Sequence, residues 1–258
     1  MYGTDRKPLP VEFSRTGKAK PFPFKGYESF LDESPLTGSK IVRYTSTPME
    51  FNVPLYESVE AVKSVSIPIA YGIPEQFISL VDKLYLHGIG VKTLNSDHRC
   101  VVERYRFHDV LFAQNPFEGR QCVDCTVERF NEEVVLPSGT FIVPTDQRTI
   151  RVIANLLEPD SPDSFVRWGF FNAFFERKEY AEPYIMEPIA REMLQKDPQL
   201  REEFYRRIDS DEAFRNDPLA RLDFFYQRSP FRDSAERVYP IVRIVDMTAY
   251  ERLGPSLF

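Results

Sequence analysis

The sequence is poor in the residues and motifs that mark most catalytic and cofactor sites. Three cysteines are too few for a disulfide framework, and none of the three histidines has a partner at metal-binding helical spacing. The motifs HExxH, HxxE and GxSxG are absent. Only 11 glycines occur, and none of them forms a phosphate-binding loop. We therefore assign no catalytic residue and no metal ligand in this chain.

The chain also lacks long apolar runs and an excess of basic charge. No stretch of about 18 apolar residues is present, so we expect no membrane span. The net charge is −6, with lysine and arginine spread among acidic residues, so we expect no nucleic-acid partner. The first 27 residues have no apolar core of the kind found in signal peptides, so the sequence leaves the compartment unknown.

One short cysteine motif needs separate treatment. Cys122 and Cys125 form a CxxC pair, a spacing seen in redox and zinc sites. The pair lies in a segment with strand-like alternation, where residues three apart point to opposite faces. We therefore expect neither redox chemistry nor metal binding from it.

What the sequence has in abundance is aromatic and apolar side chains. Hydrophobic residues make up 42% of the chain, and there are 22 phenylalanines and 13 tyrosines. A chain of this length and composition is able to bury a large core. The aromatic load is heavy enough that part of it is expected to face a partner or to fill a core between poorly matched layers.

The order of the patterns predicts an α+β protein with a mixed or antiparallel sheet and one strand–helix–strand unit, followed by a mostly helical C-terminal part. Residues 1–26 are rich in proline and predict an extended leader or linker. Residues 27–160 predict the sheet domain, and residues 161–258 predict helices packed on that sheet as one structural unit with it. Asp197 and Asp217 each precede a proline, which predicts a capped helix start at both positions.

The stretch from Leu156 to Tyr184 contains the only tryptophan, within a cluster of phenylalanines. Its second half predicts a helix over residues 163–180 that carries a broad aromatic stripe. Such a stripe is typical of a core helix, but it also suits an interface or the rim of a ligand site. The candidate interface or ligand-contacting residues are Glu158, Asp163, Trp168 and Asn172. A weaker alternative is that Glu158 and Asp163 form an acid/base pair.

Several segments resemble a known family. They include IPIAYGIPEQFISLVDKLYLHGIGVKTL, NPFEGRQ, LPSGTFIVPTDQ and LLEPDSPDSFVRWGFFNAFFERKEYAEPYIMEPIAREML. They are similar to the C-terminal region of large bacterial zinc carboxypeptidases of the carboxypeptidase A-like type. The resemblance extends from about Pro21 to Ile244 and is most specific over residues 156–184.

The resemblance implies an accessory role. The zinc ligands and catalytic residues of that family lie in a preceding domain and correspond to no residue here, so zinc is expected only in that domain. The implied function is a non-catalytic region that packs against a peptidase domain, in cis or in trans, and shapes access to it, with peptide substrate as a further partner. The family also implies an extracellular or periplasmic location. The alternative is a stand-alone peptide- or carbohydrate-binding module that uses the aromatic region around Trp168.

Overall fold

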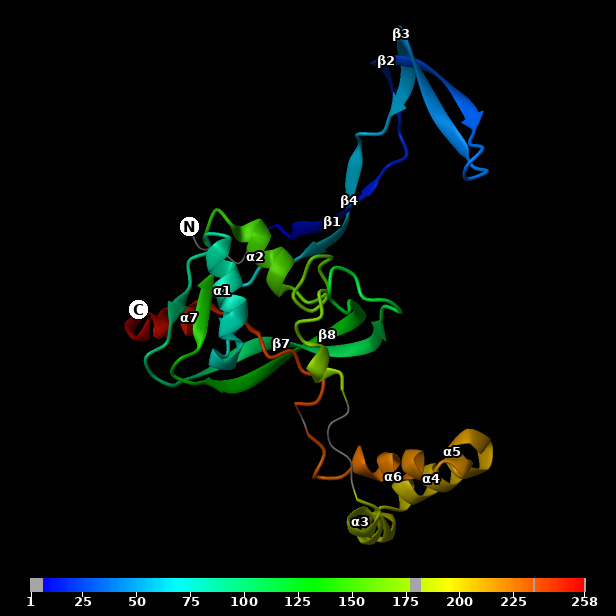
Figure 1. Cartoon of the computed structure of the whole chain (residues 1–258). Coiled ribbons are helices and arrows are strands. Elements are labelled where there is room, and N and C mark those ends of the chain that lie inside the picture. The colour runs from blue at the N-terminus through cyan, green and yellow to red at the C-terminus, as the bar shows by residue number, and fades with distance from the viewer. Residues whose placement is uncertain (1–6, 177–181, 234, 258) are drawn as a thin grey trace.

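A six-stranded sheet forms the centre of the molecule (Figure 1). The structure is a computed structural model, and it describes residues 7–176, 182–233 and 235–257. All neighbouring strands in the sheet pair antiparallel. Their order is β6 (Lys92–Thr93), β9 (Phe141–Pro144), β5 (Ala70–Ile73), β10 (Val242–Ile244), β7 (His98–Phe112) and β8 (Val123–Leu136).

The predicted strand–helix–strand unit is confirmed. Strands β5 and β6 both pair antiparallel with β9, which lies between them, so they run parallel to each other. The helix that joins them begins with a short 3₁₀ turn, η1 (Glu75–Phe77), and continues as α1 (Ile78–Leu86). Gly88 follows with a φ of +70°, the left-handed conformation that favours glycine at a helix end.

Both faces of the sheet are buried because its strands alternate between two apolar cores. On one face, α1 and α2 (Ile150–Leu157) cover a core that includes Ile73, Phe107 and Val143. On the other face, a smaller core around Ile142 and Ile244 is closed by α7 (Met247–Leu253), which the 3₁₀ turn η3 (Gly254–Ser256) follows. Successive residues of one strand therefore serve different cores.

A long two-stranded extension leaves this body. Strands β1 (Leu9–Arg15) and β4 (Val59–Val65) form a ribbon whose root packs on α2. The ribbon leads to a hairpin of β2 (Lys20–Glu33) and β3 (Lys40–Leu55), which we call the arm. The arm projects away from the rest of the molecule (Figure 1). Much of the expected leader thus forms paired strands, while the domain limits at residues 26 and 160 stay a prediction.

The helical C-terminal part builds a separate core. Met186, Phe204, Phe214 and Phe225 are among its buried members, and the cluster draws only on residues 186–226. The Asp197 and Asp217 carboxylates accept backbone N–H bonds at the starts of two helices, which confirms both predicted caps. The four helices are α3 (Pro183–Lys196), α4 (Pro198–Ser210), α5 (Glu212–Asn216) and α6 (Pro218–Tyr226).

The predicted helix over residues 163–180 is wrong for the part that the structure describes. Residues 165–171 form turns, η2 (Asn172–Phe174) is a single 3₁₀ turn, and residues 177–181 lie outside the described residues. The cause is Gly169, whose φ is +73°. The N–H of Gly169 bonds to Val166 O, and the N–H of Phe170 bonds to Phe165 O. This pair of bonds is a Schellman motif, which ends a helix after one turn.

We expect Gly169→Ala to destabilise the protein by about 3 kcal/mol, because alanine is strained at this φ and its Cβ would meet a neighbour. That Cβ would lie 2.4 Å from the backbone oxygen of Gln121, which has little freedom to move. The matched control is Gly88→Ala, which has a similar φ and open space, and which should cost about 1 kcal/mol. Urea unfolding measures both values, and equal losses would contradict this account.

Candidate functional site

The most unusual feature of the interior is a row of polar side chains across three adjacent strands. Arg243 of β10 lies opposite Tyr71 of β5 and, on its other side, opposite Glu103 of β7. Cross-strand partners point to the same face, so all three side chains enter the core under α1 and α2. Arg243 is only 2% exposed, and its neighbours in the strand, Val242 and Ile244, are apolar and buried as well.

Glu158 joins this row of polar side chains from the side of the sheet that α2 covers. It is the residue at which α2 ends, and its side chain is 0% exposed. The Tyr71 hydroxyl donates to Glu158 Oε1 at 2.6 Å, and the Tyr105 hydroxyl donates to Oε2 at 2.5 Å. Arg243 Nε lies 3.1 Å from Glu158 Oε1, and Arg243 also forms an ion pair with Glu103. We call these five residues the buried polar cluster.

Burial dominates the electrostatics of the cluster. Desolvation raises the pKa of Glu158 to about 7, although the hydrogen bonds from Tyr105 and Tyr71 act in the opposite direction. Burial also raises the pKa of Tyr71 and of Tyr105 well above the usual range, with a further contribution from the Glu158 charge. Both phenols therefore stay neutral and remain hydrogen-bond donors.

The cluster also makes hydrogen bonds to the base of the β1–β4 ribbon, where β4 ends. Arg243 donates hydrogen bonds to the backbone oxygen and the hydroxyl of Ser66, which follows β4 directly. Lys63 of β4 donates to the backbone oxygen of Asp160 at 2.9 Å, two residues after Glu158. The Tyr239 hydroxyl donates to Leu157 O at 3.1 Å. The arrangement therefore joins α2, the sheet and the ribbon, and it leaves the Glu158 side chain fully buried.

Two of the predicted site residues, Asp163 and Trp168, lie together at the surface. The Trp168 indole N–H donates to Asp163 Oδ1 at 3.4 Å, and the Trp168 ring lies 6.1 Å from the ring of Phe117. Trp168 is half-buried, so part of the ring remains accessible. Asp163 and Glu158 occupy different environments, one at the surface and one sealed in the core. The alternative of an acid/base pair thus lacks a shared cleft.

The fourth predicted residue, Asn172, holds a turn in place. Its amide N–H donates to the backbone oxygen of Gln121 at 2.9 Å, just before β8 begins. The neighbouring Phe171 is completely buried and contacts Phe77, Phe174 and Tyr239. The aromatic residues after Gly169 therefore dock the turn onto the sheet core. The structure does not bring the four predicted residues into one site.

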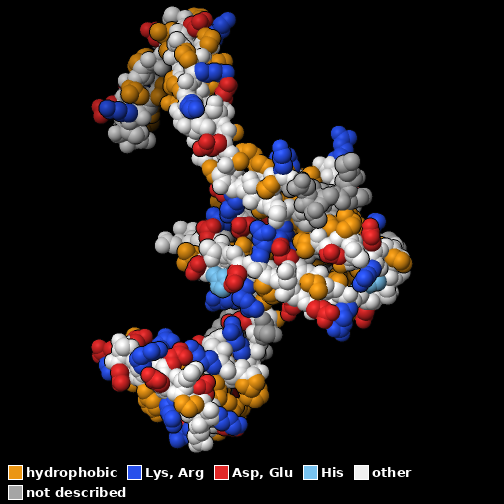
Figure 2. Space-filling model, turned by 180° about the vertical axis from the view of Figure 1, so that it is seen from behind, with side chains coloured by type: hydrophobic (Ala, Val, Ile, Leu, Met, Phe, Trp, Pro, Cys, Tyr) orange, Lys and Arg blue, Asp and Glu red, His pale blue; other side chains and the backbone are white. Residues whose placement is uncertain are grey.

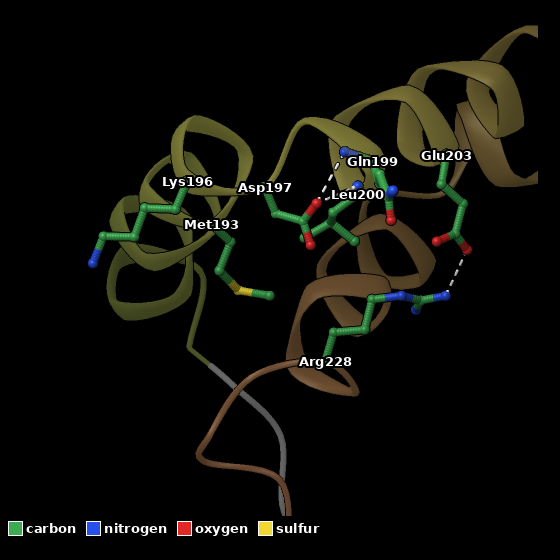
Figure 3. A pocket seen from close by; sticks show the side chains of 7 residues that line it. All are labelled: Met193, Lys196, Asp197, Gln199, Leu200, Glu203 and Arg228. Atoms are coloured by element: carbon green, nitrogen blue, oxygen red, sulfur yellow. Dashed lines mark hydrogen bonds and ion pairs between the residues drawn. The ribbon is translucent and has the colours of Figure 1, made fainter.

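Hollows on the part of the chain that the structure describes are candidates for binding small molecules. One, of about 200 Å³, lies beside the Pro159–Pro162 turn and is lined by Lys63, Cys125, Asp160 and Arg167 among others. A wider one, of about 450 Å³, lies between α3, α4 and the end of α6 (Figure 3). In Figure 3, Asp197 caps α4 and Arg228 reaches Glu203 at 2.7 Å. The polar groups of this second hollow thus already serve helix packing.

Three further features concern metal ligands, thiols and possible membrane helices. Across residues 7–176, 182–233 and 235–257, no group of three or more His, Cys, Asp or Glu side chains is placed to hold a metal ion. Cys100, Cys122 and Cys125 are free thiols. Burial raises the pKa of Cys125 to about 11, which suppresses thiolate reactivity. Among the helices described, none is both long enough and apolar enough to cross a membrane.

Sequence reasoning missed most of the buried polar cluster. It singled out Glu158 but not Arg243, Tyr71, Tyr105 or Glu103. A signal was present in the segment YPIVRIV, where a single arginine interrupts an apolar strand. An arginine at the centre of a strand covered on both faces must be paired, so its acidic partner could have been sought.

Comparison with known proteins gives a partial likeness. The chain is 28% identical over 110 residues to Carboxypeptidase 2 of Trichophyton tonsurans, Trichophyton equinum and Trichophyton rubrum. The match covers 43% of this chain and 20% of each of these relatives. No family model and no solved structure matches the chain. The chain therefore contains a region related to about a fifth of these fungal carboxypeptidases.

We expect Arg243→Met to lower the free energy of unfolding by about 3–5 kcal/mol, because it leaves two carboxylates without their buried cation. The control is Arg99→Met, which removes the exposed pair with Glu133 and should change stability by less than about 0.5 kcal/mol. Denaturant titration of both variants measures the difference. A loss below about 1 kcal/mol for Arg243→Met would mean that the cluster does not need the arginine.

Proposed function

We propose that this chain acts as a non-catalytic accessory region of a zinc metallocarboxypeptidase-like protein, where it packs against a peptidase domain and shapes access to its cleft. The observation that carries the proposal is the partial match to Carboxypeptidase 2 of three Trichophyton species. The zinc and the reacting groups would belong to the peptidase domain. This chain would supply a rigid surface beside the cleft.

The structure supports this role because its most perturbed carboxyl group is buried in the core and does not line an open cleft. Glu158, the carboxyl group with the most perturbed environment in the sheet core, is sealed from solvent by Tyr71 and Tyr105. The partners that hold it are groups of this chain, so removing one of them would leave a buried charge unpaired. Outside the arm, α1 exposes Ile78, Tyr85 and Leu86, and exposed apolar surface of this kind is typical of a protein that contacts another protein.

A chimaera tests the accessory role. The matched 110 residues of Trichophyton rubrum Carboxypeptidase 2 would be replaced by the aligned residues of this chain. We expect the kcat of the chimaera for a blocked dipeptide to stay within about threefold, because on this proposal the reacting groups lie outside the replaced segment, while KM for longer peptides changes by about tenfold. Steady-state kinetics on zinc-loaded protein measures both.

The isolated chain, with zinc added, serves as the second arm of this test. It should release no amino acid from either substrate. Hydrolysis that a chelator abolishes would contradict the non-catalytic role. A folded, zinc-loaded chimaera that is inactive on the dipeptide would contradict it as well.

A second candidate is a stand-alone peptide- or carbohydrate-binding module. The observation that favours it is the accessible part of the Trp168 ring, beside Phe117 and the Asp163 carboxylate. A flat aromatic face flanked by a polar group is a common way to hold a sugar ring or an apolar side chain. On this alternative, Asp163 would orient the ligand over the ring.

Because Trp168 is the only tryptophan, its fluorescence decides between the two candidates. Under the accessory role, pentapeptides and linear glucose hexasaccharides should leave the emission unchanged up to about 1 mM, where an ordinary ligand site would be occupied. A saturable shift that Asp163→Asn weakens and that persists in Glu33→Gln, a change on the distant arm, would favour the binding module.

A further inference from the structure

We infer that the arm is a self-association surface, and that two copies of this chain dimerise by stacking the apolar faces of their arms. The inference goes beyond the proposed function and does not depend on it. Its starting point is that the arm is a hairpin of two strands that projects from the body without cover on its faces (Figure 1). An isolated two-stranded hairpin is only marginally stable in water, and packing against another layer is the usual remedy.

The pairing register gives the arm one apolar face. Phe22 lies opposite Val53, Phe24 opposite Phe51, and Gly26 opposite Met49. Paired residues point to the same side, and so do residues two apart, so these side chains form one continuous surface. At the glycine, ring atoms of Phe51 and Phe24 lie 3.3 and 3.4 Å from the position that a Cβ would take, so the rings fill the gap and keep the face even. We call this surface the arm face.

The edges of the arm, in contrast, are closed to strand addition. The strands β2 and β3 contain Pro21, Pro23, Pro48 and Pro54. All four fall in the alternating set of pairs that excludes the arm face, such as Pro21 with Pro54. Proline has no N–H, so it occupies positions where the N–H would point away from the partner strand. A further strand would find these outer donors missing on both edges, and the partner must therefore dock on a face.

The arm face is large enough for a small homodimer interface. Phe22 is 42% exposed, Phe24 53% and Met49 49%, while Phe51 and Val53 are half-buried. Roughly 100 Å² from each of Phe22, Phe24 and Met49, and roughly 50 Å² from each of Phe51 and Val53, give about 400 Å² per copy. Two copies bury about 800 Å², below the ~1,000 Å² of a stable specific interface, so we expect a weak dimer. Phe30, which is 56% exposed, continues the alternating set of the arm face toward the tip. Figure 2 shows hydrophobic side chains exposed along the arm.

The charge pattern favours a second copy over an unlike partner. The six positions of the arm face carry no charge. The charged residues that follow in the same alternating set of pairs, Lys20 at one end and Asp32 and Arg43 at the other, form ion pairs within the chain, so stacking the face on itself brings no unpaired like charges together. The charged pair Lys25 and Glu50 lies on the opposite face. A surface built for an unlike partner typically carries charges that select that partner, and the arm face has none. Identical, flat and apolar faces satisfy the requirement of a twofold interface.

Sedimentation equilibrium of the whole chain tests the inference. Between about 1 and 200 μM, the range in which a small interface titrates, we expect the average mass to rise from monomer to dimer. Phe51→Glu should weaken the dimer at least about tenfold, because it buries a charge in the interface. Asn52→Glu is the matched control: it adds the same charge one residue further along, on the opposite face. It should leave the dimer intact.

Hydrogen exchange of the unmodified chain gives a readout that does not depend on how a variant folds. The amides of β2 and β3 should become more protected at 200 than at 1 μM, a range that covers about two decades of dimer affinity, while those of the six-stranded sheet do not change. A chain that stays monomeric throughout would overturn the inference. So would a dimer that survives Phe51→Glu, or one that Asn52→Glu weakens equally. None of these outcomes alters the kinetics of the carboxypeptidase chimaera, so the two proposals fail separately.

Discussion

The ion pairs of Arg243 hold together parts of the chain that are distant in sequence. One guanidinium contacts Glu158 at the end of α2 and Glu103 in β7, and donates to Ser66 after β4. In the low-dielectric interior, each of these groups would be costly to bury alone, so each position depends on the others. The cluster therefore fixes where α2, the sheet and the ribbon meet. Apolar packing alone, being non-directional, would allow these elements more freedom.

Local patterns predicted the elements of this fold better than their assembly. Pro74, Gly88, Asp197 and Asp217 mark helix ends by local backbone chemistry, and the helices begin or end where these residues indicate. The helix expected over residues 163–180 does not form in its described part, because Gly169 has a positive φ and ends it after one turn, although the aromatic spacing suits a helix. The strand order followed from no local pattern, because β10 inserts between β5 and β7 from far along the chain.

In the candidate site, too, the sequence indicated a single residue but not the residues that assemble around it. Glu158 stood out in the sequence because of its acidic surroundings, but its role depends on Tyr71, Tyr105 and Arg243, which lie 87, 53 and 85 residues away. Strand register brings the residues of such a cluster together, so a pattern of residues adjacent in sequence cannot predict it. The resemblance to carboxypeptidases, by contrast, came from local segments, and a region related to fungal Carboxypeptidase 2 is indeed present.

The contact of Arg243 with Ser66 also has a mechanical consequence. Ser66 lies at the base of the ribbon that carries the arm, so it acts as a pivot between the body and a long lever. Sixteen residues of β3 at about 3.3 Å each make a lever of about 50 Å, so a rotation of about 5° at the pivot moves its tip by about 4 Å. A side chain deep in the sheet core thereby sets the direction in which the arm points.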